Sequence, residues 1–114
     1  MNIRGKDYED LVSDFLSEKG HKIIFRNFNS RFGEIDIISV KDNILHFIEV
    51  KARKSDSLYY PAESVTISKI RKIRSTAKFF LLRNKDFNNW IIQFDVAEYI
   101  IDRKTVNIIE NCFY

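Results

Sequence analysis

The chain has 114 residues, 45% of them hydrophobic, with only three glycines and one proline. This composition indicates a single domain over residues 1–114 and excludes a disordered or low-complexity chain. No apolar run approaches the roughly 20 residues that cross a bilayer, and the first seven residues lack the apolar stretch of a signal peptide. The lone Cys112 has no internal disulfide partner. We therefore expect a cytoplasmic protein without a membrane partner.

The formal net charge of +3 is unevenly distributed along the chain. Residues 51–85 contain ten basic and two acidic side chains, so this segment carries +8 and the rest of the chain carries −5. Such polarity predicts a polyanion-binding face, with DNA or another nucleic acid as the partner.

The first predicted element is an amphipathic helix over residues 3–19, which ends at Gly20. Its apolar stripe consists of Tyr8, Leu11, Val12, Phe15 and Leu16. Glu9 lies beside this stripe, where it can lean towards the edge of a sheet or remain a surface charge near the positive end of the helix dipole.

A first strand is predicted over residues 21–28, followed by a polar loop at 29–31. Arg26 and Arg31 precede an acidic segment along the chain. They are candidates for contacts with phosphate groups, although arginines near loops are often only exposed.

Two further strands contain charged side chains among Ile, Val, Leu and Phe residues, at 33–38 and 47–53. The turn signal at 41–43, with Asp42 and Asn43 at its tip, predicts an antiparallel hairpin. In this register Val40 faces Leu45 and Ile38 faces Phe47.

The same register predicts that Asp36 faces Glu49 and that Glu34 faces Lys51. Side chains alternate between the two faces of a strand. Asp36, Glu49 and Lys51 are therefore expected on one face. The other face is expected to carry Ile35, Ile37, Ile48 and Val50.

Directly opposed carboxylates destabilise a sheet unless a positive charge lies between them. Asp36 and Glu49 are therefore candidate ligands of Mg²⁺, which proteins commonly hold through one or two carboxylates, water and substrate phosphate oxygens. Mn²⁺ is the expected substitute. Lys51 beside such an ion could orient an attacking water or stabilise developing negative charge, as phosphodiester hydrolysis requires. Alternatively, these charges face solvent and form ordinary cross-strand ion pairs.

The pattern Gly-Glu-Ile-Asp, a hairpin and then Glu-Val-Lys-x-Arg resembles the YraN family of predicted nucleases, within the PD-(D/E)xK superfamily of restriction-endonuclease-like and Holliday-junction-resolvase-like folds. The resemblance covers nearly the whole chain. It includes the helix with Glu9, the strand at Arg26-Asn27, residues 61–65 leading to Lys69, and Phe94-Asp95-Val96. Tyr8 departs from the small residue that the family often has before the helix acid.

The resemblance implies that Asp36, Glu49 and Lys51 are catalytic. It also implies that Glu9 is an auxiliary catalytic acid and metal ligand, and that Lys69 faces the site from the start of a helix.

A loop is predicted at 54–61, and a long helix at 66–83. Its buried stripe is expected to be Ile67, Ile70, Ile73, Ala77, Phe80 and Leu81. Another face carries a basic stripe of Arg71, Arg74, Lys78 and Lys85. Such a stripe is often merely solvated, but a strand-helix-strand crossover would lay this one beside the carboxylates, which favours contact with nucleic acid.

Two last strands are predicted at 90–101 and 105–109, joined by a turn at 102–104. Asp95 is expected to make a structural hydrogen bond or ion pair. The element order is then α-β-β-β-α-β-β, an α/β protein with a mixed central sheet flanked by helices. The resemblance implies a restriction-endonuclease-like three-layer fold.

The sequence thus favours a metal-dependent nuclease that hydrolyses phosphodiester bonds in DNA, with branched or flapped DNA as candidate substrates. A non-cleaving nucleic-acid-binding module of the same fold is the alternative, and a protein-interaction domain has little in its favour. A homodimer that cuts two strands fits the small size of the chain. The candidate nucleic-acid-binding residues are Arg26, Arg31, Arg53, Lys69, Arg71, Arg74 and Lys78.

Overall fold

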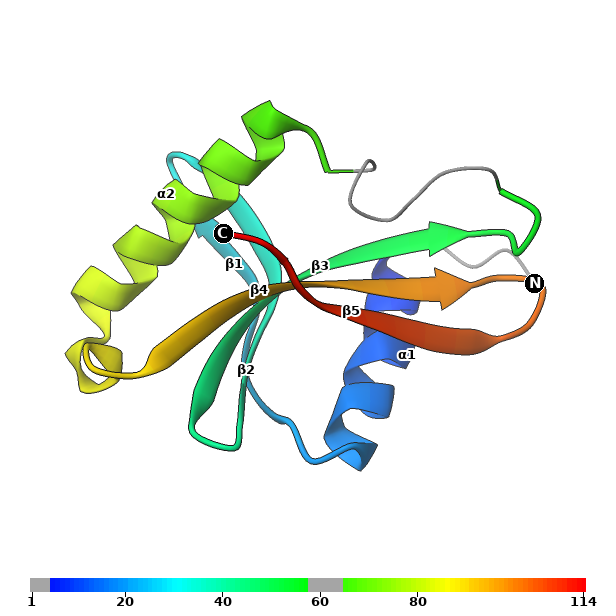
Figure 1. Cartoon of the computed structure of the whole chain (residues 1–114), viewed down its shortest axis with the longest axis horizontal. Helices are drawn as coiled ribbons and strands as arrows, with labels where there is room; N and C mark the ends of the chain where they lie inside the picture. Colours follow the sequence, from blue (N-terminus) through cyan, green and yellow to red (C-terminus); the bar gives the residue numbers. More distant parts are fainter. Residues whose placement is uncertain (1–4, 58–64) are drawn as a thin grey trace.

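The computed structural model describes residues 5–57 and 65–114. It is an α/β structure with one five-stranded sheet and two long helices (Figure 1). The elements follow one another as α1 (Gly5–Glu18), β1 (Lys22–Ser30), β2 (Gly33–Lys41), β3 (Ile44–Arg53), α2 (Ile67–Arg83), a short 3-10 helix η2 (Lys85–Phe87), β4 (Ile91–Ile100) and β5 (Thr105–Phe113). Residues 58–61 of the predicted loop, and residues 61–64 of the resemblance, lie outside the described residues.

The sheet is mixed, with the strands in the order β1-β2-β3-β4-β5. β3 and β4 are parallel, whereas the other neighbours are antiparallel. Parallel neighbours need a crossover connection, and α2 lies on this crossover. Within the described part of the chain, no helix is long and apolar enough to cross a membrane.

The hairpin of β2 and β3 has the predicted turn. Asp42 and Asn43 both have positive φ, 53° and 62°, as two-residue hairpin turns with a type I′ twist require. The predicted pairs Val40 with Leu45 and Ile38 with Phe47 are confirmed.

The predicted pairing is wrong beyond Ile37, where the ladder between β2 and β3 ends. Asp36 and Glu34 have no ladder partner on β3, because β2 continues from here with β1 alone, as far as Gly33. Asp36 instead accepts a hydrogen bond at Oδ2 from the Val50 backbone N–H, at 2.7 Å.

The core lies on both faces of the sheet. On the α2 face, Phe80 packs against Ile38, Leu45, Phe47 and Phe94, and on the α1 face Val12 and Leu16 pack against Ile37, Ile48, Ala97 and Tyr99. Ile35 was expected to share a face with Ile37, but it packs on the α2 face. The alternation of side chains breaks at Asp36, where β2 leaves β3.

Both helices agree with their predicted positions to within two residues. Gly20, at φ 96°, adopts the left-handed conformation that lets the chain turn after α1. Thr66 caps α2, since its hydroxyl accepts the Lys69 backbone N–H at 3.1 Å. Ile67 was expected to be buried, but it is 71% exposed, because the first turn of α2 extends beyond the edge of the core. Thr76, which was not expected in the buried stripe, is buried.

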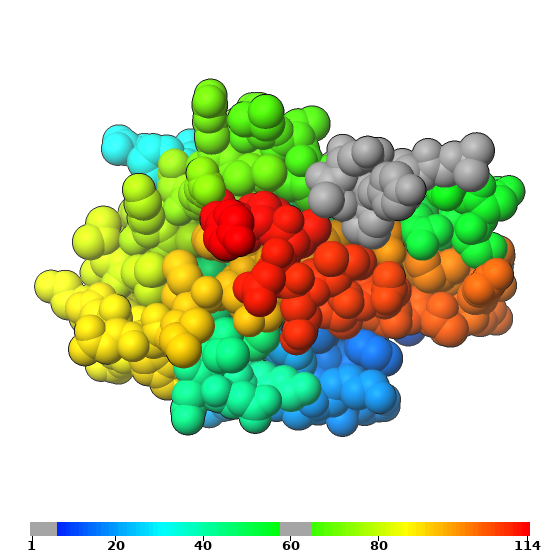
Figure 2. Space-filling model, in the orientation of Figure 1, coloured from blue at the N-terminus to red at the C-terminus, as the bar shows by residue number. Residues whose placement is uncertain are grey.

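Several strands are longer than predicted. β2 ends at Lys41 and β3 begins at Ile44, beyond the segments at 33–38 and 47–53. Residues 29–30 belong to β1, so the turn to β2 is only Arg31 and Phe32. β5 continues to Phe113 instead of ending at 109. The extension contains an irregularity at Asn111, whose φ is 51° and whose N–H donates to Asp95 Oδ1 at 3.0 Å. In Figure 2 the C-terminal residues lie beside α2.

A candidate active site where two strands separate

The candidate site forms where β2 leaves β3, since this brings a carboxylate from each strand together. Glu49 is only 7% exposed, and Asp36 is partly buried. Burial, a hydrogen bond with the Glu49 carboxyl group and the charge of that group raise the pKa of Asp36 to about 7. The pair therefore favours a shared proton or a bound cation near neutral pH.

Lys69 is the cation in contact with this pair. Its Nζ lies 3.2 Å from Glu49 Oε2. Burial opposes its charge, but Glu49 and Asp36 prevail and raise the pKa of Lys69. The predicted orientation of Lys69 towards the site is confirmed.

Lys51 lies on β3, two residues after Glu49. Burial and then the neighbouring Lys69 ammonium lower the pKa of Lys51, against the opposite effects of Glu49 and Asp36. A lysine with a lowered pKa loses its proton more readily than a solvent-exposed lysine with an ordinary pKa. Its amine can then accept a proton or a hydrogen bond from water. The two lysines thus differ: one is held as an ion-pair partner and the other is driven towards its neutral form.

Glu9 on α1 belongs to a neighbouring acidic group. Burial, followed by the charges of Asp36 and Glu34, raises the pKa of Glu9. Asn27, at φ 53°, lies between the acids and, with its amide oriented to match them, donates to Glu9 Oε2 at 2.9 Å and to Glu34 Oε1 at 2.8 Å. This bridging role was missed, because the sequence does not show that Asn27 lies between the two carboxylates.

Whether a metal ion fits the candidate site depends on the side-chain atoms that are available to bind it. Among the described residues, no three His, Cys, Asp or Glu side chains are grouped so that they could hold a metal ion. Asp36, Glu49 and Glu9 therefore do not form a closed cage. The carboxylates of Asp36 and Glu49 are in contact, and this contact raises the pKa of Asp36. Two such oxygen donors suit a hard cation that takes its remaining ligands from water and substrate phosphates.

Two of the candidate nucleic-acid-binding arginines have carboxylate partners. Arg26 Nη2 lies 2.6 Å from Asp10 Oδ1 on α1. Arg53 Nε donates to the buried Glu98 Oε2 at 2.8 Å. These two arginines thus stabilise the fold around the site, a role that the sequence pattern did not indicate.

The other basic candidates are arranged differently. Arg71, Arg74 and Lys78 are exposed on α2, and Arg31 is exposed at the β1–β2 turn, with its guanidinium 4.8 Å from the centre of the Phe32 ring. These four side chains are available to a polyanion.

A buried polar network lies on the α1 face, and the sequence did not reveal it. His46 Nδ1 lies 2.7 Å from Asp95 Oδ2, so the expected structural role of Asp95 is confirmed. His21 Nδ1 lies 2.8 Å from Ser39 Oγ, and the two imidazole rings are 4.8 Å apart. The partners are far apart along the chain, His46 on β3 with Asp95 on β4, and His21 just before β1 with Ser39 on β2, so no local motif indicated them.

Comparison with known proteins identifies the family. The model of the uncharacterised protein family UPF0102 matches residues 8–99, which include every candidate site residue. A UPF0102 protein of Clostridium novyi is 49% identical over 109 residues, covering 92% of this chain and 90% of that protein. One from Caldicellulosiruptor saccharolyticus is 37% identical over 119 residues, covering 99% and 100%. The chain therefore belongs to the uncharacterised protein family UPF0102.

Proposed function

We propose that this protein is a metal-dependent nuclease of the restriction-endonuclease-like PD-(D/E)xK class, which hydrolyses phosphodiester bonds in DNA. Branched and flapped DNA are the candidate substrates. One observation carries the proposal: two carboxylates, Asp36 and Glu49, meet two lysines where β2 and β3 separate. A purely structural ion pair needs neither the second carboxylate nor the second lysine.

Asp36 and Glu49 would hold Mg²⁺ or Mn²⁺, with Glu9 as the auxiliary acid nearby. When bound, the ion supplies positive charge to the phosphate and lowers the pKa of a coordinated water. Lys51, whose pKa is lowered, orients the attacking water and stabilises charge on the phosphate in the transition state. Lys69 keeps Glu49 in position through their ion pair.

The exposed basic residues of α2 supply affinity for the nucleic acid. Arg71, Arg74 and Lys78 follow Lys69 along the same helix. Phosphate groups that approach them displace counterions, which favours binding without sequence preference.

The alternative function is a nucleic-acid-binding module that does not cleave. One observation favours it: Lys69 already neutralises Glu49, so the carboxylates do not depend on a metal for charge balance. Both functions require nucleic-acid binding, and only the first requires hydrolysis.

The test is incubation of the purified protein with single-stranded, duplex, flapped and four-way DNA, in Mg²⁺, in Mn²⁺ and with a chelator. We expect cleavage that needs the metal and is lost in Glu49→Gln, which keeps the size of the side chain. Asp14→Asn, an exposed acid on α1, is the matched control and should cleave normally. Binding without cleavage of any substrate would favour the alternative.

A further inference from the structure

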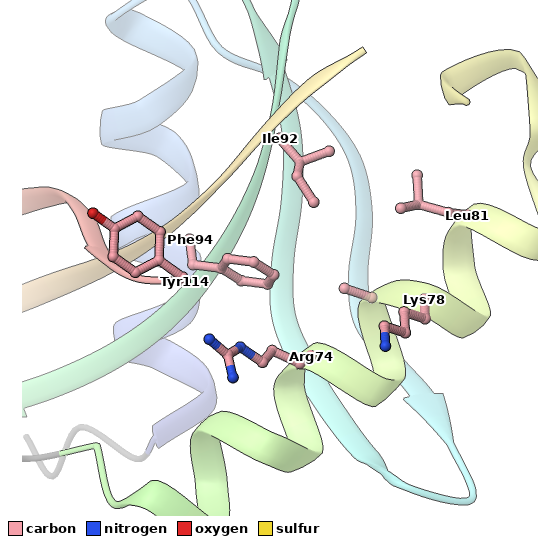
Figure 3. A pocket seen from close by; sticks show the side chains of 7 residues that line it. Arg74, Lys78, Leu81, Ile92, Phe94 and Tyr114 are labelled. Atoms are coloured by element: carbon pink, nitrogen blue, oxygen red, sulfur yellow. The ribbon is translucent and has the colours of Figure 1, made fainter. Parts of the chain in front are cut away.

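Two hollows flank α2, and the proposed chemistry uses neither. The first, of about 300 Å³, lies between α2 and β4 (Figure 3). Its apolar lining comes from Leu81, Ile92 and Phe94, with Tyr114 beside them, while Arg74 and Lys78 lie along its α2 side. Tyr114 is 86% exposed, so its ring is available to a ligand.

The second hollow, of about 440 Å³, lies between α2 and the β1–β2 turn. Phe32, Phe79 and Leu82 give it an apolar lining, and Arg31 joins Lys78 as its charged residues. Lys78 lines both hollows, so the two are adjacent across the helix. Phe32 is 38% exposed, and this aromatic ring is therefore accessible at the mouth of the hollow.

The charges around the hollows have one sign. Of the described residues that line them, the charged ones are Arg31, Arg74 and Lys78, all of them basic. Within residues 5–57 and 65–114, neither Arg74 nor Lys78 takes part in a salt bridge. By contrast, the charged residues that line the hollow between α1 and β5 are of both signs, Asp14 and Glu18 with Lys104.

Apolar and aromatic walls with a cationic rim suit a ligand that has a flat body and an anionic group. Unpaired nucleotides have this chemistry, because their bases stack on aromatic side chains while basic residues contact their phosphates. The bases of a continuous duplex are stacked on each other and cannot enter such hollows.

The hollows also lie within reach of the candidate active site. Lys69, which contacts Glu49, and Lys78 are both on α2. An α-helix rises 1.5 Å per residue, so these two lysines are about 14 Å apart along the axis. Nine residues are about two and a half helical turns, so the two lysines lie on opposite sides of α2. A strand that leaves the hollows would pass around α2 over this distance to reach the carboxylates.

We propose that the two hollows bind the bases of an unpaired nucleic-acid strand, whose phosphates lie on Arg31, Arg74 and Lys78. This inference rests on the proposed nuclease function and specifies its substrate as DNA with unpaired bases next to the cleavage site. Discrimination against continuous duplex then comes from α2 and not from the carboxylates.

The experiment measures strand binding in EDTA, so that cleavage plays no part. Fluorescence anisotropy compares a 12-residue oligothymidylate with an abasic deoxyribose-phosphate strand of the same length and charge. One stacked base changes affinity by a factor of about 5 or more. We therefore expect the wild-type protein to bind oligothymidylate at least about fivefold more tightly than the abasic strand.

The double variant Phe32→Ala/Tyr114→Ala should lose this preference while keeping its affinity for the abasic strand. Ile67→Ala is the matched control, because Ile67 is exposed on α2 and lines neither hollow. It should behave as the wild type does.

Equal wild-type affinity for the two strands would overturn the inference, and this comparison requires no variant to fold. An unchanged preference in the folded double variant would also overturn it. A third outcome would also overturn it. If sedimentation shows a wild-type dimer, and the double variant is a monomer with unchanged strand binding, the hollows are an interface between copies of the chain. A protein that shows the base preference but never cleaves would refute the nuclease function, while the hollows would still be the binding site for unpaired bases.

Discussion

The ionised carboxylates of Asp36 and Glu49 should destabilise the metal-free fold at alkaline pH. The variant Asp36→Asn should therefore have a larger free energy of unfolding there than the wild type. Burial and Glu49 raise the pKa of Asp36 to about 7, above the ordinary value near 3.9. Between these two values the folded protein binds more protons than the unfolded chain. Stability therefore falls as the pH rises through this window, and the loss is complete above the folded pKa.

The size of the effect follows from the difference between the two pKa values. Each pH unit corresponds to 1.36 kcal/mol, so a shift of about three units gives an upper value of about 4 kcal/mol. The pKa of Asp36 already reflects the opposing charge of Lys69, and the Glu49 carboxyl group can hold the proton in place of Asp36, so the cost lies below this upper value. We therefore expect Asp36→Asn to stabilise the metal-free protein by about 2 to 4 kcal/mol at pH 8. The Asn side-chain oxygen can still accept the Val50 N–H.

The assay is urea unfolding of the wild type and Asp36→Asn at pH 5 and pH 8 in EDTA. The difference between the two proteins at each pH cancels the titrating groups that do not interact with Asp36. It should be larger at pH 8 than at pH 5, and Mg²⁺ at pH 8 should stabilise the wild type alone. Asp14→Asn should show no such dependence. If Asp36→Asn is less stable than the wild type at pH 8 in EDTA, the two carboxylates do not oppose each other as described.

Three further predictions concern the metal site, α2 and the buried His21. In calorimetry, Mn²⁺ should bind the wild type saturably and Asp36→Ala much more weakly, and equal binding would exclude this metal site. A triple variant with alanine in place of Arg71, Arg74 and Lys78 should bind duplex DNA with a weaker salt dependence. The slope of the logarithm of the binding constant against the logarithm of the salt concentration should decrease in magnitude by about 0.9 per lost contact, and an unchanged slope would show that α2 does not contact the DNA. Burial lowers the pKa of His21 to about 4, so the unfolded chain binds more protons between about pH 6.5 and pH 4. The contribution of His21 to stability should therefore be lost on acidification through this window, where the contribution of Asp36 grows. His21→Asn should remove this loss, so that in denaturant titrations the variant gains more stability on acidification than the wild type does; an identical pH profile would show that His21 does not titrate in this way.

Local patterns predicted the hairpin well. Asp42 and Asn43 adopt left-handed conformations readily, so the turn and its adjacent register follow from a few neighbouring residues. The register failed beyond Ile37 because β2 there continues with β1 alone, and the sequence does not show where one strand leaves another.

The candidate site was predictable in part. Asp36, Glu49 and Lys51 stood out as charges within apolar strands, and the family resemblance placed Lys69 beside them. The partners of Arg26 and Arg53 could not be predicted, because Asp10 and Glu98 reach them only through tertiary packing.

The same limit hid the buried histidines. His46 and Asp95 are brought together by the parallel pairing of β3 with β4, and nothing in the spacing of the two residues indicates it. Periodicity predicts which face of an element is buried, but it does not identify the partner across the sheet.

The most direct test of a hydrolytic site is single-turnover cleavage of a labelled substrate by the wild type and Lys51→Ala, in Mg²⁺ and in Mn²⁺. In the proposed mechanism Lys51 acts on the attacking water and the transition state and does not hold the metal. Lys51→Ala should therefore abolish cleavage while metal binding stays nearly intact and DNA binding weakens only modestly. Glu49→Ala, as a second inactive variant, excludes a contaminating nuclease. Activity that persists unchanged in both variants would contradict the assignment of catalysis to this strand.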